Sequence, residues 1–230
     1  TPAGHGPAPN ALAVLPGAPL NLRDLEQTLE TLARLPSQAA RFHIVPGSVD
    51  GSSVVVITPD GGPRWRGHLA ADTTESRDQG PLLTQLNLTL DAPLGLSDQL
   101  ALVASWSGRR LGGHGPQQAS LLVQHSLPWG RHLLSVSVSA STSRRTIDSG
   151  VGRFDETGDD GQLQARWQTM AWRGAGARVA LWVGGTWQRA RASVGGTELL
   201  LRRHDSGRVD LGANWLLQTG CGDLTVELEA

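Results

Sequence analysis

The spacing of apolar residues changes once along the chain, near residue 60. Before that point, leucines recur at three- and four-residue steps: Leu22, Leu25, Leu29 and Leu32. This spacing places them on one side of a helix and predicts an amphipathic helix over Leu22–Leu35. Asn21 is the expected N-cap, and Pro36 is expected to stop the helix.

Two shorter segments with strand character follow the predicted helix. In Ala39–Val45 apolar and polar residues alternate, and Ser53–Thr58 is a run of β-branched residues. Turn residues, including Pro46-Gly47, separate the two segments. We therefore predict a small α+β unit made of a helix and two strands.

From residue 64 to the end, the period is two and no helix is predicted. The clearest segment alternates four apolar residues with four serines: Leu134, Val136, Val138, Ala140, and Ser135, Ser137, Ser139, Ser141. Similar segments repeat between turn clusters and predict about nine strands, beginning with Trp65–Thr73. Most connections are short, whereas the polar stretch Ser143–Gly161 reads as a longer, solvated connection.

Strands with one apolar and one polar side fit two architectures. In a soluble sandwich the apolar sides pack against each other, and in an outer-membrane barrel they face lipid while the polar sides line a wet lumen. Predicted strands of about ten residues match a tilted membrane span better than sandwich strands do. Trp106, Trp187 and Trp215 lie toward strand ends on the apolar side, as in an aromatic girdle. The pattern favours the barrel.

Strand number and chain ends suggest a partial barrel. Bacterial single-chain barrels have an even number of strands, whereas about nine are predicted here. The first residues also lack the basic start and apolar core of a secretory signal peptide. We therefore expect the chain to be part of a longer protein.

Composition and motifs argue against several classes of function. The net charge of −1 offers no support for nucleic-acid binding. The single cysteine, Cys221, excludes an internal disulfide and a cysteine-based zinc cluster. No histidine pair has metalloprotease spacing, and neither a GxSxG elbow nor a phosphate-binding loop is present. We expect no enzymatic activity, no metal and no cofactor.

A longer series of residues resembles a known family. The series consists of five ordered segments: Gly17–Gln27, Leu32–Pro36, Pro46-Gly47, Gly51–Val56 and Leu90–Asp98. It resembles the two-partner secretion transporters, the outer-membrane haemolysin secretion/activation proteins. The motif residues are Leu20, Asn21, Leu22, Arg23, Asp24, Leu25, Glu26, Gln27, Pro46 and Gly47.

The resemblance implies an architecture and a location. Members have two periplasmic POTRA domains in front of an outer-membrane barrel. Residues 10–60 are similar to the second POTRA domain without its first strand, and residues 64–230 to the N-terminal half of the barrel. The implied fold is an α+β POTRA-like unit followed by an incomplete antiparallel transmembrane β-barrel. The implied location is the outer membrane of a Gram-negative bacterium, with the POTRA part in the periplasm.

The resemblance also implies export of a large exoprotein, a haemolysin or adhesin, through the barrel. The expected partners are this passenger and outer-membrane lipid, with no nucleic acid. A passenger can bind by strand addition to an open sheet edge, for which Arg41, His43 and Val45 are the candidates. The alternative interpretation is that Arg41 and His43 are ordinary solvated strand residues.

Two other functions remain open from the sequence. One is a passive outer-membrane channel or small barrel protein unrelated to secretion, which does not require the α+β unit. The other is a soluble sandwich with a ligand-binding face. Whether the apolar sides of the strands face outward or stack in a dry interior separates the sandwich from both barrels.

Overall fold

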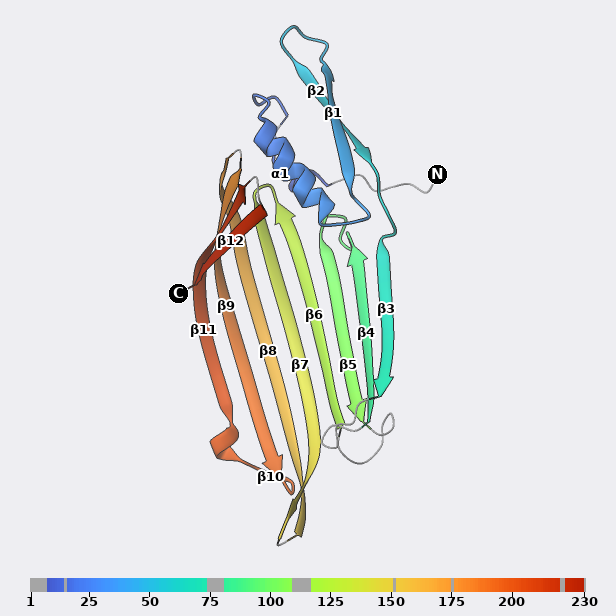
Figure 1. The fold of residues 1–230 in the computed structure, drawn as a ribbon, viewed down its shortest axis with the longest axis vertical. Coiled ribbons are helices and arrows are strands. Elements are labelled where there is room, and N and C mark those ends of the chain that lie inside the picture. Colours follow the sequence, from blue (N-terminus) through green and yellow to red (C-terminus); the bar gives the residue numbers. More distant parts are fainter. Residues whose placement is uncertain are drawn as a thin grey trace.

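A computed structural model of the 230-residue chain describes residues 8–14, 16–73, 81–108, 117–150, 152–174, 176–219 and 222–229. A small helix unit, residues 8–60, lies at one end of a long antiparallel sheet (Figure 1). The elements are η1 (Pro9–Ala11), α1 (Leu22–Ala33), β1 (Ala40–Pro46), β2 (Ser53–Pro59), β3 (Trp65–Thr73), β4 (Leu82–Asp91), β5 (Gln99–Gly108), β6 (Gln117–Trp129), β7 (His132–Ser149), β8 (Gly152–Arg173), β9 (Ala177–Val194), β10 (Thr197–Glu198), η2 (Leu200–Arg202), β11 (His204–Thr219) and β12 (Gly222–Glu229).

Helix α1 forms where the leucine spacing predicts it. Asn21 has an extended backbone, and its side chain accepts a hydrogen bond from the backbone N–H of Arg23, which confirms the N-cap. Leu25, Leu32 and Leu35 are buried and form most of the small apolar core of the helix unit. Among the described residues, no helix combines the length and the apolar character needed to cross a membrane.

Strands β1 and β2 form a two-stranded antiparallel sheet that confirms the two predicted strands. The register pairs Ala40 with Pro59 and Pro46 with Ser53. A hydrogen bond from the backbone N–H of Gly47 to the carbonyl of Ser52 closes the hairpin end. A Cβ on Gly47 would lie 2.1 Å from Ser52 Oγ, so this turn has little room for a side chain.

The large sheet is an antiparallel meander. Its order is β12-β11-β9-β8-β7-β6-β5-β4-β3, so each long strand pairs with its neighbours in sequence, and the two-residue β10 pairs with β9. Nine long strands agree with the predicted number. Short turns join β6 to β7 and β8 to β9 at the end nearest α1, whereas β9 reaches β11 through β10 and η2 at the opposite end (Figure 1).

The two faces of this sheet differ in chemistry. Its outer face exposes many large apolar side chains, including Leu121, Leu134, Val138, Leu163, Leu181, Val183, Val209 and Leu211. The inner face, which looks onto the space beneath α1, carries mainly serine, glutamine, asparagine and threonine. In the described residues of the long strands, only three apolar side chains are buried: Pro128, Ala180 and Trp182. The apolar sides therefore do not stack in a dry interior, and the soluble-sandwich alternative is wrong.

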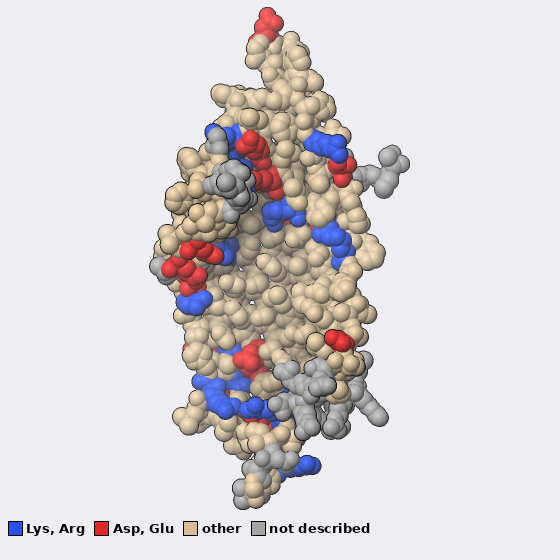
Figure 2. Space-filling view, viewed as in Figure 1, with Lys and Arg blue, Asp and Glu red and all other residues tan. Residues whose placement is uncertain are grey.

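Charged residues are unevenly distributed over the surface. In Figure 2 much of the visible sheet is uncharged, and charged residues gather near the helix unit, at the β12 edge and toward the far end.

The polar stretch Ser143–Gly161 differs from the prediction. It is not a loop but the far part of the β7–β8 hairpin, whose turn lies between Ser149 and Gly152. Cross-strand pairs hold it, including the ion pair Arg145–Glu156 (2.6 Å) and the hydrogen bond from Thr146 to Asp155 (3.0 Å). Because polar residues occupy both faces here, the alternation that marks the other strands is missing from the sequence.

Strand length indicates where the hairpin ends. Strands β7 and β8 have 18 and 22 residues, whereas β4 and β5 have 10 each. A tilted strand crosses the apolar layer in about 9–11 residues, so the hairpin extends beyond that layer on the side away from α1. The turn η2, also not predicted, lies at this far end (Figure 1).

Candidate functional site

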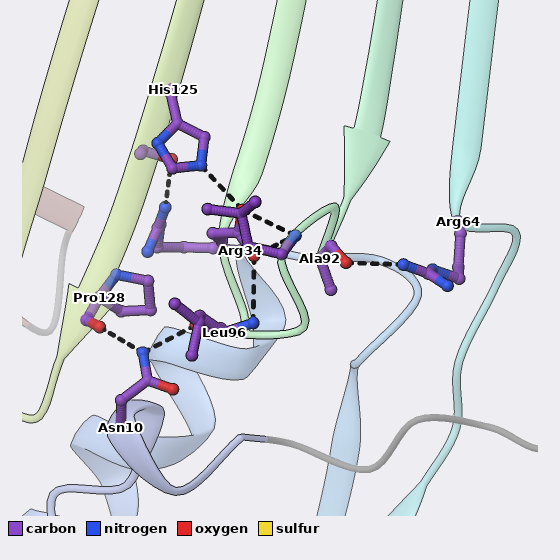
Figure 3. Close-up of polar contacts among 10 residues, drawn as sticks. Asn10, Arg34, Arg64, Ala92, Leu96, His125 and Pro128 are labelled. Carbon is purple, nitrogen blue, oxygen red and sulfur yellow. Dashed lines mark hydrogen bonds and ion pairs between the residues drawn. The ribbon is translucent and has the colours of Figure 1, made fainter.

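The junction between the helix unit and the rim of the sheet is the best-defined polar site. Here the N-terminal segment, α1 and the segments before β1 and β3 contact the turns β4–β5, β6–β7 and β8–β9. Figure 3 shows part of it, with Asn10 and Arg34 from the helix unit directed at Leu96, Pro128 and β6.

Asp91, the last residue of β4, is the centre of this junction. Its side chain is fully buried and accepts two hydrogen bonds from the Arg66 guanidinium, both 2.9 Å long. It also accepts bonds from Gln99 Nε2 and from the backbone N–H of Ser37, both 3.1 Å. One carboxylate thus joins β3, β4, β5 and the segment after α1. A bidentate arginine pair fixes orientation as well as distance.

A second buried carboxylate, Asp98, holds the β4–β5 turn. It accepts hydrogen bonds from the backbone N–H groups of Leu94 and Leu96, and its Oδ2 lies 2.8 Å from His125 Nε2. Burial raises the pKa of Asp98, but the hydrogen bonds from His125 and the backbone outweigh this, so the pKa lies below the ordinary value of 3.8. The carboxylate therefore stays ionised at neutral pH.

The same turn contains backbone strain. Ala92 and Ser97 have φ values of 51° and 52°, in the left-handed region that residues with a Cβ rarely adopt. Arg64 donates to the Ala92 carbonyl (2.6 Å), and Ser97 Oγ accepts from the backbone N–H of Ala8 (3.0 Å). Such strain persists where surrounding contacts fix it, which indicates a turn shaped to receive the helix unit.

Asn10 ties two rim turns together. Its Nδ2 donates to the backbone carbonyls of Leu96 and Pro128, both at 2.7 Å. The backbone carbonyl of Asn10 accepts a hydrogen bond from the backbone N–H of Gly130 (2.7 Å). Arg34, at the end of α1, donates to Ser126 Oγ on β6 at 2.8 Å (Figure 3). These contacts fix the N-terminal segment and the C-terminal end of α1 on the rim.

The middle of α1 is held by more exposed ion pairs. Glu30 pairs with Arg173 of β8 and with Arg178 of β9, and Arg173 also donates to Gln27 (2.9 Å). Burial raises the pKa of Glu30, but the hydrogen bonds and charges of Arg173 and Arg178 outweigh this, so the pKa lies below the ordinary value of 4.5. Glu30 is therefore charged, and it holds α1 against the β8–β9 end of the rim.

A cavity of about 730 Å³ lies between α1 and the inner face of the sheet. Its helix side includes Gln27, Glu30 and Thr31, and its sheet side includes Gln168 and Asn214. We call it the mouth cavity, because it lies at the α1 end of the inner face. The lining mixes amides, hydroxyls and charged groups, which can donate and accept hydrogen bonds, with apolar side chains such as Leu133, Met170 and Leu216.

The motif residues predicted from the sequence fall into two groups. Several act structurally: Asn21 caps α1, Leu25 is buried, Asp24 pairs with Arg131 (3.2 Å), and Gln27 accepts from Arg173. Pro46 ends β1 and Gly47 begins the tight turn. The exposed members are Leu20, Leu22, Arg23 and Glu26. Asp24 and Gln27 thus contact the rim directly, whereas Leu22, Arg23 and Glu26 line a second cavity between α1 and the β8–β9 end of the rim.

The three predicted partner-binding residues lie on β1, far from the junction. Arg41, His43 and Val45 are exposed and share one side of the strand. Arg41 forms an ion pair with Asp60 (2.7 Å) in which both side chains are largely exposed, so the pair contributes little stability. In the described part of the chain β1 pairs with β2 alone, which leaves its other edge open.

Sequence reasoning missed most junction residues. Asp91 and Asp98 bracket a Pro- and Gly-containing turn, where acidic residues are ordinarily solvated. Asn10, Thr28 and Thr31 lie outside the leucine pattern, yet both threonines are buried. The available signal was the Leu90–Asp98 motif itself, which carries both carboxylates. Cys221 lies outside the described residues.

The fold and the junction together define a class of protein. A meander with an apolar outer face, a polar inner face and a helix unit at the short-turn end is the wall of an outer-membrane β-barrel with a POTRA-like unit at its periplasmic mouth. The model of the family "Haemolysin secretion/activation protein ShlB/FhaC/HecB" matches residues 51–230, and a POTRA domain model matches residues 6–46. The chain belongs to this family, so the predicted resemblance to two-partner secretion transporters is confirmed.

Individual relatives agree with this assignment. The chain is 32% identical over 199 residues to the outer membrane transporter CdiB of Dickeya dadantii, an alignment covering 86% of this chain and 35% of that protein. It is 33% identical over 128 residues to the hemolysin transporter ShlB of Serratia marcescens, covering 56% and 23%. The matched part is about a third of the length of the first relative and about a quarter of the second.

The solved structure of CdiB from Escherichia coli has the same fold. It superimposes with a TM-score of 0.86 over 96% of this chain and 42% of that chain, at 24% identity. The family places this chain in the outer membrane of a Gram-negative bacterium, with the helix unit on the periplasmic side.

Proposed function

We propose that this chain takes part in two-partner secretion, forming the periplasmic mouth and part of the wall of a pore that exports a large exoprotein. One observation carries the proposal: the sheet turns its apolar side chains outward and its hydrogen-bonding side chains toward the space beneath α1. The relatives are transporters by name, including hemolysin transporters, which supports a secreted toxin or adhesin as the passenger. The role is transport rather than catalysis.

The passenger first binds along β1 in this proposal. An open strand edge offers backbone N–H and C=O groups to an incoming extended segment, and the exposed side chains of Arg41, His43 and Val45 lie beside it. The captured segment then passes α1 and follows the inner face. The domain boundaries proposed for these two steps are residues 10–60 for capture and 64–230 for passage.

Two measurements test the proposal: secretion of the exoprotein into the medium, and crosslinking of the exoprotein to β1. The gene is expressed in a Gram-negative host together with a large exoprotein encoded beside it, and the exoprotein is measured in the medium. A photo-crosslinking residue replacing His43 should capture the passenger, whereas one replacing the fully exposed Leu201, at the far end of the sheet, serves as the control. Absence of the exoprotein from the medium, although the barrel protein is assembled in the outer membrane, would reject export.

A further inference from the structure

Trp182 differs from every other tryptophan in the chain, all eight of which lie in the described part. The strand register, which shifts between Met170 and Trp172, places the other seven on the outer face. Six of them are strongly exposed: Trp65, Trp129, Trp167, Trp172, Trp187 and Trp215. Trp182 lies between Leu181 and Val183 of β9 and therefore points to the inner face. It is only 7% exposed.

The neighbouring strands leave a recess for this indole. Trp182 stands opposite Gly212 of β11, and a Cβ on Gly212 would lie 2.6 Å from the indole ring. On the other side, the Arg166 guanidinium lies over the ring, 3.8 Å from its centroid. The indole ring therefore lies between Gly212 and the Arg166 guanidinium. It is close to the mouth cavity, which Ala180 and Asn214 line.

Three buried polar atoms in this cluster have no hydrogen-bond partner. They are Trp182 Nε1 and Arg166 Nε, which are donors, and Asn214 Oδ1, which is an acceptor. A buried tryptophan N–H usually has a partner, and leaving such groups unpaired costs stability. Trp182 is paired with Gly212, and Asn214 follows two residues later on the same face, so the acceptor lies one position along the strands from the indole.

The charge balance of the cluster limits what can bind there. Arg166 is partly neutralised by Glu227, whose Oε1 lies 3.9 Å away. A free anion would approach Glu227 and Asn214 Oδ1 unfavourably, and a free cation would approach Arg166 unfavourably. A peptide group satisfies both requirements, because its carbonyl accepts from Trp182 Nε1 or Arg166 Nε while its N–H donates to Asn214 Oδ1.

We infer that Arg166, Trp182 and Asn214 form a binding site for the backbone of an extended, uncharged polypeptide segment, at the edge of the mouth cavity where Asn214 lies. This inference rests on the proposed export function and assigns one contact on the passenger's path. Recognition through the peptide group is independent of passenger side chains, which suits a pore wall along which a long chain must move.

The binding test follows the indole N–H resonances of the ¹⁵N-labelled chain in detergent micelles. The probe is a short unstructured peptide of serine, asparagine and glycine, and Trp182→Phe identifies the Trp182 resonance. That resonance should shift saturably on titration, and Asn214→Ala should weaken binding about two- to tenfold, as expected for one lost hydrogen bond. Trp187→Phe, on the outer face, should leave the affinity unchanged. A Trp182 resonance that does not move, or that moves no more than those of the outer tryptophans, overturns the site.

The secretion assay keeps the two proposals distinguishable. Trp182→Phe retains the ring and loses only the N–H, so it should slow export while the protein still assembles in the membrane. The site is rejected, and the export function is kept, if this variant exports at the wild-type rate and the Trp182 resonance of the wild-type chain does not respond to the peptide. Failure of the wild-type chain to support export rejects the function, and the peptide titration then decides the site by itself.

Discussion

Several leucines are buried in the helix unit, whereas leucines on the outer face of the large sheet are exposed. In the helix unit, Leu25, Leu32 and Leu35 are buried against their neighbours and exclude water. In the sheet, leucines such as Leu134 and Leu163 face outward with more than two fifths of their surface exposed. The first arrangement is stable in water, whereas the second is stable only where the surroundings are also apolar.

This difference shows that the two regions depend on different solvents, and polar contacts help to hold them together at the junction. Buried carboxylates, Asn10 and arginine pairs make that connection, and they lie where the apolar layer ends. Substitutions at the junction, in the helix core and on the two faces of the sheet should therefore have separable effects.

The largest effect is expected for Asp91→Ala at the junction. It removes a fully buried carboxylate and leaves the Arg66 guanidinium, Gln99 and the Ser37 N–H without their acceptor. We expect a loss of about 3–5 kcal/mol, the range for breaking a buried ion pair by removing one partner. Urea unfolding in detergent measures it, with Asp60→Ala in the exposed Arg41 pair as the control. Equal, small losses in both variants would contradict a central role for Asp91.

The next comparison makes one substitution in both regions. Leu32→Ala in α1 removes a side chain with no exposed surface and should cost about 2–5 kcal/mol, because a cavity remains. Leu163→Ala on the outer face removes lipid contact without creating a cavity and should cost about 1 kcal/mol. Unfolding from lipid vesicles measures both values. A larger cost at Leu163 would mean that the outer face packs against protein.

A third pair of substitutions tests the two faces of one strand. Val138→Arg places a charge in the middle of the outer face and should destabilise the membrane-inserted state by about 2–4 kcal/mol. Ser137→Arg, one residue away on the inner face, should be nearly neutral. Folding yield into vesicles of defined lipid distinguishes them. The opposite order would reverse the assignment of the faces.

A smaller effect is expected at the start of α1. Asn21→Ala removes the capping bond to the backbone N–H of Arg23 and should cost about 1 kcal/mol. Circular dichroism during thermal unfolding of the chain measures the change. Asn21→Asp, which keeps a capping oxygen, should restore most of the stability, and failure of this rescue would point to a different role for the side chain.

The smallest expected effect is a pH dependence at Glu30. Because the folded state lowers the pKa of this group, its contribution is complete above the ordinary value of 4.5 and is lost as the pH falls through the folded-state pKa. The pairs with Arg173 and Arg178 are partly exposed, so the contribution should stay below about 1 kcal/mol. Glu30→Gln should reduce the stability difference between pH 7 and pH 3, and an unchanged difference would show that Glu30 does not contribute.

The local elements could be predicted from the sequence because their signals are local. Leucine spacing predicted α1, Asn21 predicted its start, and period-two alternation predicted the strands and their polar side. Even the inward direction of Trp182 follows from its parity between Leu181 and Val183. The hairpin beyond the apolar layer was missed because polar residues on both faces show no alternation.

The junction could not be predicted because its contacts join residues that are distant in sequence. Asn10 and Pro128 are 118 positions apart, and Glu30 and Arg178 are 148 apart. Nothing in the pattern around Glu30 indicates which arginine it will meet, since that depends on how the whole sheet places β8 and β9 beneath α1. The family resemblance supplied the overall arrangement, and the structure supplied the partners.

The meander has a kinetic consequence. Every long strand bonds only to the strands that precede and follow it in the chain, so each hairpin needs to close only a short loop. Native contacts between sequence neighbours generally form fast. The wall can therefore grow hairpin by hairpin as it enters the bilayer, with each completed ribbon acting as the template for the next.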